Sequence, residues 1–81
     1  MTRTEIATKV QNFLVEDFEL DAEAMQDENA RLKEDVGIDS LDFVDIVVIT
    51  EREFGFKPVP AELKNAKTLG QFYDYIARNL V

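Results

Sequence analysis

The chain of 81 residues suits a single domain spanning residues 1–81. It contains neither cysteine nor histidine, which excludes disulfides, thiolate or imidazole metal sites, a cysteine nucleophile and a Ser-His dyad. Its net charge of −8 argues against a nucleic-acid binder, because phosphate contacts need clustered lysine and arginine. We therefore expect a non-catalytic protein whose partners present basic surfaces.

Hydropathy gives no sign of a membrane or export segment. The first residues lack the apolar core of a signal peptide, and no run approaches the roughly 18 apolar residues of a membrane span. We therefore expect a soluble, cytoplasmic monomer. The negative charge is concentrated in residues 16–56, since residues 16–35 carry nine acidic and two basic side chains and residues 36–56 carry five acidic and one basic.

The N-terminal segment predicts a helix over residues 3–16. Thr2 and Glu5 have the spacing of a capping box, in which each side chain binds the backbone N–H of the other residue. The apolar residues that follow recur on one helical face, which indicates packing against a core. These residues are Ile6, Val10, Phe13 and Leu14.

Residues 17–38 are expected to be a mostly irregular connection, with a short helical turn near residues 21–27. Their many carboxylates would repel one another in a packed element, and the charged run from Glu19 to Glu28 is expected to be a solvated surface. A connection this long is unusual in a compact domain. Apolar residues spaced along it can hold it against the helices, namely Phe18, Leu20, Met25, Leu32 and Val36.

The next segment predicts a helix over residues 40–54 that stops before Gly55. Asp39 is a favourable N-cap, and Asp42 can complete a reciprocal cap. One apolar stripe should face the core, consisting of Phe43, Ile46, Val47, Thr50 and Phe54. A neighbouring stripe consists of Leu41, Val44, Val48 and Glu51.

The C-terminal third predicts two more helices. Pro60 suits the first position of a short helix over residues 60–64, and Thr68 with Gln71 forms a second capping-box pattern. The last helix, over residues 69–79, has an apolar stripe that Tyr75 lies off, so Tyr75 is expected at the surface. The fold class is thus all-α: a small four-helix bundle with three longer helices, a short third helix and a long loop between helices one and two.

Ser40 is the candidate functional residue. In the first helical turn the backbone N–H groups are unpaired and the helix dipole favours negative charge. A phosphate ester on an exposed hydroxyl at this place would be well accommodated. The alternative is that Ser40 only helps to start the helix, a common role for serine.

The segment 34–42, EDVGIDSLD, resembles the acyl carrier proteins, as do Val44, Asp45 and the run 51–54. The resemblance extends over nearly the whole chain. In that family the serine of an Asp-Ser-Leu motif carries 4′-phosphopantetheine through a phosphodiester, which implies that Ser40 is the attachment point. It further implies a carrier that holds acyl groups as thioesters and shuttles them between enzymes of fatty-acid, polyketide or related lipid synthesis.

The same resemblance implies two further sets of residues. The cargo can fold into an apolar gap between helices two and three, for which the lining would be Val44, Ile46, Val47, Leu63, Ala66 and Leu69. Helix two would dock on basic patches of a phosphopantetheinyl transferase and of acyl-loading, condensing and transfer enzymes. Its contact residues would be Asp39, Leu41, Asp42, Asp45, Val48 and Glu51.

Other readings of these residues stay open. The cargo could be an activated amino acid or an aromatic acid, or the chain could be an acidic helical interaction module without a prosthetic group. A metal site is not expected, because Asp39, Asp42 and Asp45 have helical spacing and no calcium-loop motif occurs. Departures from the family pattern, at Arg52 and around Lys64 and Lys67, point to a carrier dedicated to one pathway.

Overall fold

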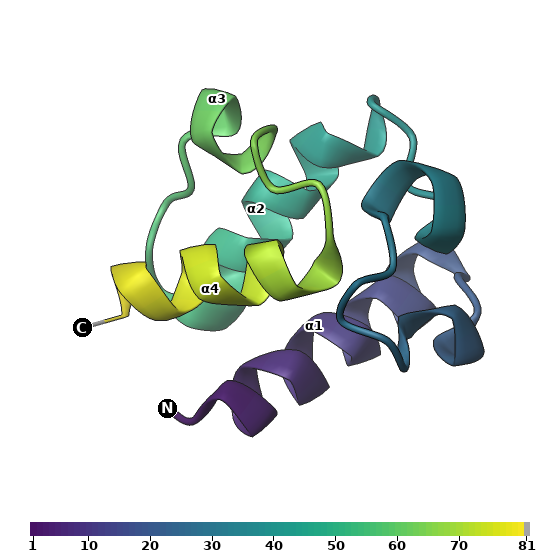
Figure 1. Cartoon of the computed structure of the whole chain (residues 1–81). Coiled ribbons are helices and arrows are strands. Elements are labelled where there is room, and N and C mark those ends of the chain that lie inside the picture. Colours follow the sequence, from purple (N-terminus) through teal and green to yellow (C-terminus); the bar gives the residue numbers. More distant parts are fainter. Residues whose placement is uncertain (81) are drawn as a thin grey trace.

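A computed structural model describes residues 1–80 of the chain. Helices account for all the regular structure in this range, which confirms the predicted all-α fold, with three longer helices and a short third (Figure 1). The α-helices are α1 (Arg3–Phe18), α2 (Asp42–Phe54), α3 (Pro60–Leu63) and α4 (Leu69–Asn79). Two shorter helical segments, η1 (Ala22–Met25) and η2 (Leu32–Val36), lie between α1 and α2. Within residues 1–80 no helix is long and apolar enough to cross a membrane.

The start of α1 follows from the predicted capping box. The Glu5 N–H donates to Thr2 Oγ1 at 3.2 Å, and the Thr2 N–H donates to Glu5 Oε1 at 3.0 Å. The helix continues two residues beyond the predicted end. It stops at Glu19, which adopts a left-handed backbone with φ of 56° although it is not glycine. Because the terminating residue is not glycine, no local signal in the sequence marks this end of the helix.

The connection between α1 and α2 is more ordered than predicted. The expected turn near residues 21–27 is present as η1, a 3₁₀ segment, but η2 is a single turn of π-helix that the sequence did not indicate. Gly37 ends η2 with φ of 94°, a conformation that favours glycine. The N–H groups of Gly37 and Ile38 both donate to the Leu32 carbonyl, at 3.1 and 2.8 Å. The apolar residues Met25, Leu32 and Val36 are buried and hold the connection against the core, as expected.

Residues 28–32, here called the tether, run alongside the start of α4. The Gly70 N–H donates to the Glu28 carbonyl at 2.8 Å, and the Leu69 N–H donates to the Ala30 carbonyl at 3.1 Å. The Leu32 N–H donates to the Lys67 carbonyl at 2.9 Å. A Cβ atom at position 70 would lie 3.2 Å from the Glu28 carbonyl oxygen, which explains a glycine in the first turn of α4.

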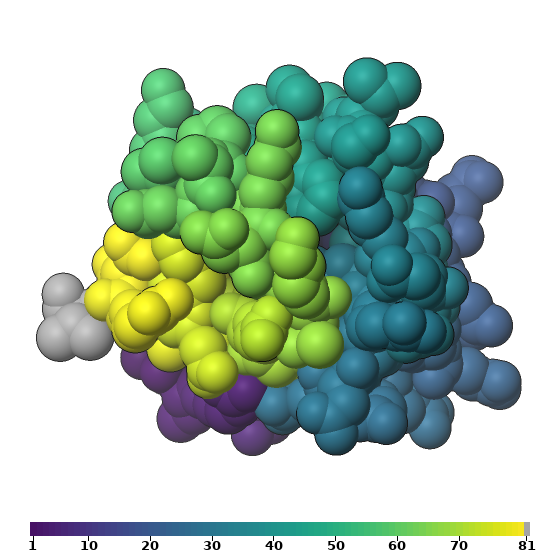
Figure 2. All heavy atoms as spheres, turned by 45° about the horizontal axis from the view of Figure 1, so that its top comes forward, coloured from purple at the N-terminus to yellow at the C-terminus, as the bar shows by residue number. Residues whose placement is uncertain are grey.

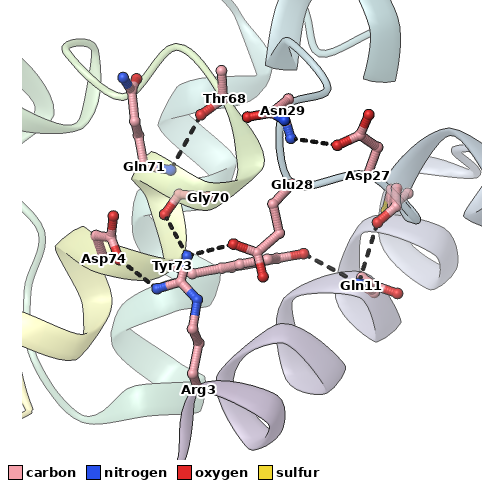
Figure 3. Close-up of polar contacts among 11 residues, drawn as sticks. Arg3, Gln11, Asp27, Glu28, Asn29, Thr68, Gly70, Gln71, Tyr73 and Asp74 are labelled. Carbon is pink, nitrogen blue, oxygen red and sulfur yellow. Dashed lines mark hydrogen bonds and ion pairs between the residues drawn. The ribbon is translucent and has the colours of Figure 1, made fainter.

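Polar side chains reinforce this junction at the N-terminal end of α1. The Arg3 guanidinium donates to Glu28, to Asp74 and, at 3.2 Å, to the Gly70 carbonyl (Figure 3). Both carboxylates favour the charged guanidinium, and they raise the pKa of Arg3. Arg3 also lies 5.7 Å from the centroid of the Tyr73 ring. The start of α1, the tether and α4 are therefore joined at one point.

The core lies between α1, α2 and α4 and is closed by α3 and η2. Its fully buried large side chains come from every helix and include Ile6, Leu14, Met25, Leu32, Ile46, Leu63, Phe72, Tyr73 and Ile76. The prediction for Tyr75 was wrong, because this side chain is only 6% exposed. Its ring lies 6.1 Å from that of Phe56, and its hydroxyl accepts from the Val59 N–H at 3.0 Å. Tyr75 thus packs against the segment between α2 and α3, which covers this side of α4.

Candidate functional site

Ser40 lies in an exposed turn immediately before α2. The helix begins at Asp42, two residues later than predicted, so Ser40 precedes the first helical turn. Asp39 does not cap the helix with its side chain, and Leu41 occupies the N-cap position without a side-chain cap. The Asp39 carboxylate instead accepts a hydrogen bond from Ser40 Oγ at 3.3 Å. The prediction of Asp39 as N-cap was therefore wrong, whereas the exposure of Ser40 was right.

Asp42 closes this turn. Its N–H donates to the Asp39 carbonyl at 3.0 Å, and its carboxylate accepts from the Asp39 N–H at 3.1 Å. This second bond is the half of the predicted reciprocal cap in which Asp42 reaches back. The two bonds leave Ser40 and Leu41 at the tip of the turn, and Leu41 is 78% exposed. The hydroxyl of Ser40, the only serine in the sequence, is thus presented to solvent in a fixed turn.

An exposed apolar stripe continues from this tip along α2. Val44 and Val48 are 68% and 60% exposed, which is unusual for large apolar side chains. Asp45 and Glu51 are also exposed on α2. Within residues 1–80, a mixed apolar and acidic face of α2, here called the α2 face, is thus left uncovered. It contains the residues expected to contact partners: Asp39, Leu41, Asp42, Asp45, Val48 and Glu51.

The residues expected to line an acyl gap divide into two groups. Five are buried at 9% exposure or less, namely Ile46, Val47, Leu63, Ala66 and Leu69. Val44 does not belong with them, because it lies on the exposed α2 face. Its helical position, three residues after Leu41 and four before Val48, places it on that stripe. Phe43, expected in the core, is half-buried and lies at the edge of a cleft described next.

A cleft of about 600 Å³ opens beside Ser40, between η2 and the connection from α3 to α4. Both walls lie on the face shown in Figure 2, where η2 is dark teal and the connection after α3 is green. Its lining consists of Arg31, Leu32, Lys33, Glu34, Ser40, Phe43, Lys64, Ala66 and Lys67. The sequence showed that Lys64 and Lys67 were unusual, but it did not show that η2 brings Arg31 and Lys33 close to them.

The cations of this cleft are held in two different ways. Arg31 is engaged by its own helical turn, with Nε 3.3 Å from Asp35 Oδ2 and 3.9 Å from Glu34 Oε2. Hydrogen bonds from the Arg31 backbone N–H and guanidinium lower the pKa of Asp35. Within residues 1–80, no carboxylate lies within 4 Å of the ammonium groups of Lys33, Lys64 or Lys67.

This arrangement fits a phosphate-linked prosthetic group on Ser40. Ser40 Oγ is exposed, it belongs to a turn fixed at both ends, and it borders a cleft whose charged lining is mostly positive. Exposed ammonium groups would offset the charge of a phosphodiester. The adjoining α2 face offers apolar and acidic contacts to an enzyme that handles the group. Fold and site together are those of a small helical carrier, with Ser40 as the candidate attachment point.

The comparisons with known proteins agree with this class. Residues 8–76 match the family model described as phosphopantetheine attachment site. The chain is 40% identical over 79 residues to an acyl carrier protein of Thermotoga maritima, covering 98% of this chain and 96% of that one. It is 32% identical over 76 residues to an acyl carrier protein of Lactobacillus acidophilus, covering 94% of each. The chain belongs to the acyl carrier protein family, whose prosthetic group is 4′-phosphopantetheine.

Proposed function

We propose that the Ser40 hydroxyl carries 4′-phosphopantetheine as a phosphodiester, and that the protein shuttles acyl thioesters between enzymes of fatty-acid, polyketide or related lipid synthesis. The single observation that carries this proposal is the position of Ser40 Oγ, exposed at the tip of a turn that two Asp39–Asp42 hydrogen bonds close. Membership of the acyl carrier protein family supports it. When bound, the group supplies a thiol, which this cysteine-free chain lacks.

The role of the chain in the loading reaction is to present one oxygen. The hydroxyl donates to the Asp39 carboxylate at 3.3 Å, which leaves the lone pairs of Oγ free to form the ester bond. The new Oγ–P bond would replace the bond between the two linked phosphates of coenzyme A, so that adenosine 3′,5′-bisphosphate leaves and the hydroxyl proton passes to a base of the transferase. The catalytic groups come from a phosphopantetheinyl transferase, and the carrier is its substrate. Because Asp42 fixes the backbone on either side of Ser40, the transferase meets an oxygen that is already positioned.

Enzyme partners would dock on the α2 face. Exposed ion pairs contribute only about 0–1 kcal/mol each, so Asp45 and Glu51 would steer encounter and orientation more than they hold the complex. Leu41 and Val48 would add apolar contact at the centre of the interface. Weak and steered docking suits a shuttle, because the carrier must leave each enzyme after one step.

An acyl cargo would occupy the space between α2 and α3. The five buried residues there fill that space with apolar side chains in the structure, so a guest chain must displace some of them. Leu63 and Ala66 lie in and after a helix of only four residues, which holds little helical hydrogen bonding of its own. Displacing α3 would therefore cost less free energy than displacing α2 or α4.

Intact mass after incubation with coenzyme A and a phosphopantetheinyl transferase tests the proposal. The wild type should gain one phosphopantetheinyl group, and Ser40→Ala should gain none. Thr8→Ala, which removes an exposed hydroxyl from the middle of α1, should be modified like the wild type. A wild-type chain that stays unmodified with several transferases would favour an acidic interaction module. The mass of the carrier isolated from its own cells would separate an acyl cargo from an amino acid or aromatic acid.

A further inference from the structure

The cleft beside Ser40 is basic although the protein is strongly acidic. Four of the nine lysine and arginine residues line it, and Glu34 is the single acidic residue of the lining. The rest of the surface near Ser40 has the opposite charge, because Asp39, Asp42 and Asp45 lie on the turn and on α2. Ser40 therefore stands at a boundary between a positive cleft and a negative helix face.

The walls of the cleft are fixed by backbone contacts. The Leu32 N–H donates to the Lys67 carbonyl at 2.9 Å, and an antiparallel bridge pairs Arg31 with Thr68. The Lys67 N–H donates to Gln71 Oε1 at 2.6 Å, which ties this wall to α4. The lysines thus project from a backbone that is held in place.

Three of the four cations are available to a ligand. Arg31 binds Asp35 and lies near Glu34, whereas Lys33, Lys64 and Lys67 have no carboxylate partner in the part of the chain that the structure describes. Clustered unpaired ammonium groups repel one another, so an anion between them would relieve this repulsion. Each exposed ion pair contributes little free energy, but three ammonium groups that contact one anion would add their contributions.

We propose that this cleft binds the phosphodiester of the arm on Ser40 and so directs the arm towards the connection after α3 and away from the α2 face. The inference rests on the proposed function, since it needs an arm on Ser40. A phosphate bonded to Ser40 Oγ lies at the edge of the cleft, because Ser40 is part of its lining. The carboxylates of Asp39, Asp42 and Asp45, on the turn and on α2, repel the same phosphate. The α2 face then stays open for partner enzymes while the arm lies elsewhere.

Nuclear magnetic resonance of apo and holo protein tests the proposal. We expect that adding the arm shifts the backbone amides of Lys64, Ala66 and Lys67, which are distant in sequence from Ser40, more than those of Val44 and Val48. The phosphorus resonance of the holo protein should move as salt is raised, since salt screens the lysines. In Lys64→Gln/Lys67→Gln the amide shifts should shrink and the phosphorus resonance should lose this salt dependence.

A control variant should remove the same number of positive charges as Lys64→Gln/Lys67→Gln without altering the lining of the cleft. Lys57→Gln/Arg78→Gln also removes two positive charges, neither of which lines the cleft, and should behave like the wild type. Shifts that follow α2 in the holo protein, or equal effects of the two double variants, would overturn the proposal. If intact mass shows no arm on Ser40, the proposed function fails as well. An arm that is present without the cleft signature overturns this inference alone.

Discussion

The hydroxyl of Tyr75 accepts a hydrogen bond from the Val59 N–H at 3.0 Å and donates to Glu62 Oε1 at 3.1 Å. One side chain of α4 therefore holds both the residue before α3 and a residue within it. Burial of the ring raises the pKa of the Tyr75 hydroxyl, so it stays protonated and able to donate near neutral pH. The position of α3, and with it one wall of the basic cleft, depends on this contact.

Tyr75→Phe should therefore destabilise the fold. The change keeps the ring but leaves the Val59 N–H and Glu62 without their partner, and one such hydrogen bond is worth about 1 kcal/mol. Urea unfolding followed by circular dichroism would measure the loss. Tyr73→Phe provides the comparison, because it removes a bond from Gln11 at 3.1 Å on the opposite side of the core. If α3 depends on Tyr75, only Tyr75→Phe should change the amide resonances of Val59 and of residues 61–63.

Replacement of the buried Thr50 by valine should stabilise the fold. Its side chain is fully buried in α2, and its Oγ1 has no hydrogen-bond partner within residues 1–80. Valine has nearly the same shape without the hydroxyl, so Thr50→Val should raise the free energy of unfolding by about 1 kcal/mol. Thr50→Ser keeps the hydroxyl, removes a methyl group and should lower stability. A Thr50→Val protein less stable than wild type would contradict this account of the buried hydroxyl.

Charge on the α2 face should control the rate of encounter with partner enzymes. We expect Asp45→Asn/Glu51→Gln to lower kcat/KM with a cognate enzyme by roughly two- to tenfold at low salt, with the difference shrinking as salt screens the charges. Asp42 is unsuitable for this test, because its carboxylate also closes the Ser40 turn at 3.1 Å. Glu16→Gln/Glu23→Gln removes the same charge from outside α2 and serves as the control. Equal kcat/KM for the two double variants at low salt would show that the α2 face is not the docking surface.

Asp35 should contribute stability that depends on pH. Hydrogen bonds from Arg31 lower the pKa of its carboxyl in the folded state, so the unfolded chain binds the proton more readily. The contribution is present above the ordinary aspartate pKa of about 3.9 and is lost as pH falls through the folded value. The stability difference between wild type and Asp35→Asn should thus be largest near neutral pH and fade in acid.

A control separates this effect from the general loss of negative charge. Glu16→Gln removes an exposed carboxylate of α1 that has no hydrogen-bond partner within residues 1–80. Its stability difference from wild type should not follow the same acid transition. Urea unfolding at pH 7 and at about pH 3 would compare the two variants. A constant difference for Asp35→Asn across this range would refute the assigned role of Arg31.

Local signals in the sequence were sufficient for most helix boundaries. The capping residues of α1, Pro60 at the start of α3 and Gly55 after α2 each act through neighbouring backbone atoms, so their effects can be read from spacing alone. The start of α2 was misplaced because Asp39 bonds to Ser40 instead of capping, a choice between two local partners that spacing does not decide.

Tertiary placement explains what the sequence could not show. Tyr75 lies off the apolar stripe of α4, and only the path of the segment before α3 buries it. Val44 was grouped with buried residues, yet none of residues 1–80 covers that face of α2. The basic cleft joins residues 31–34 to residues 64–67, and only the tether brings these segments together.

The backbone hydrogen bonds of the tether make local opening of this junction measurable by hydrogen exchange. The amide hydrogens of Leu32, Leu69 and Gly70 are each sheltered by a carbonyl across the junction. Separation of the tether from the connection after α3 and from the start of α4 breaks these three bonds while the helices stay intact. Deuterium uptake at those three sites would then report how often this junction opens, separately from unfolding of the whole chain.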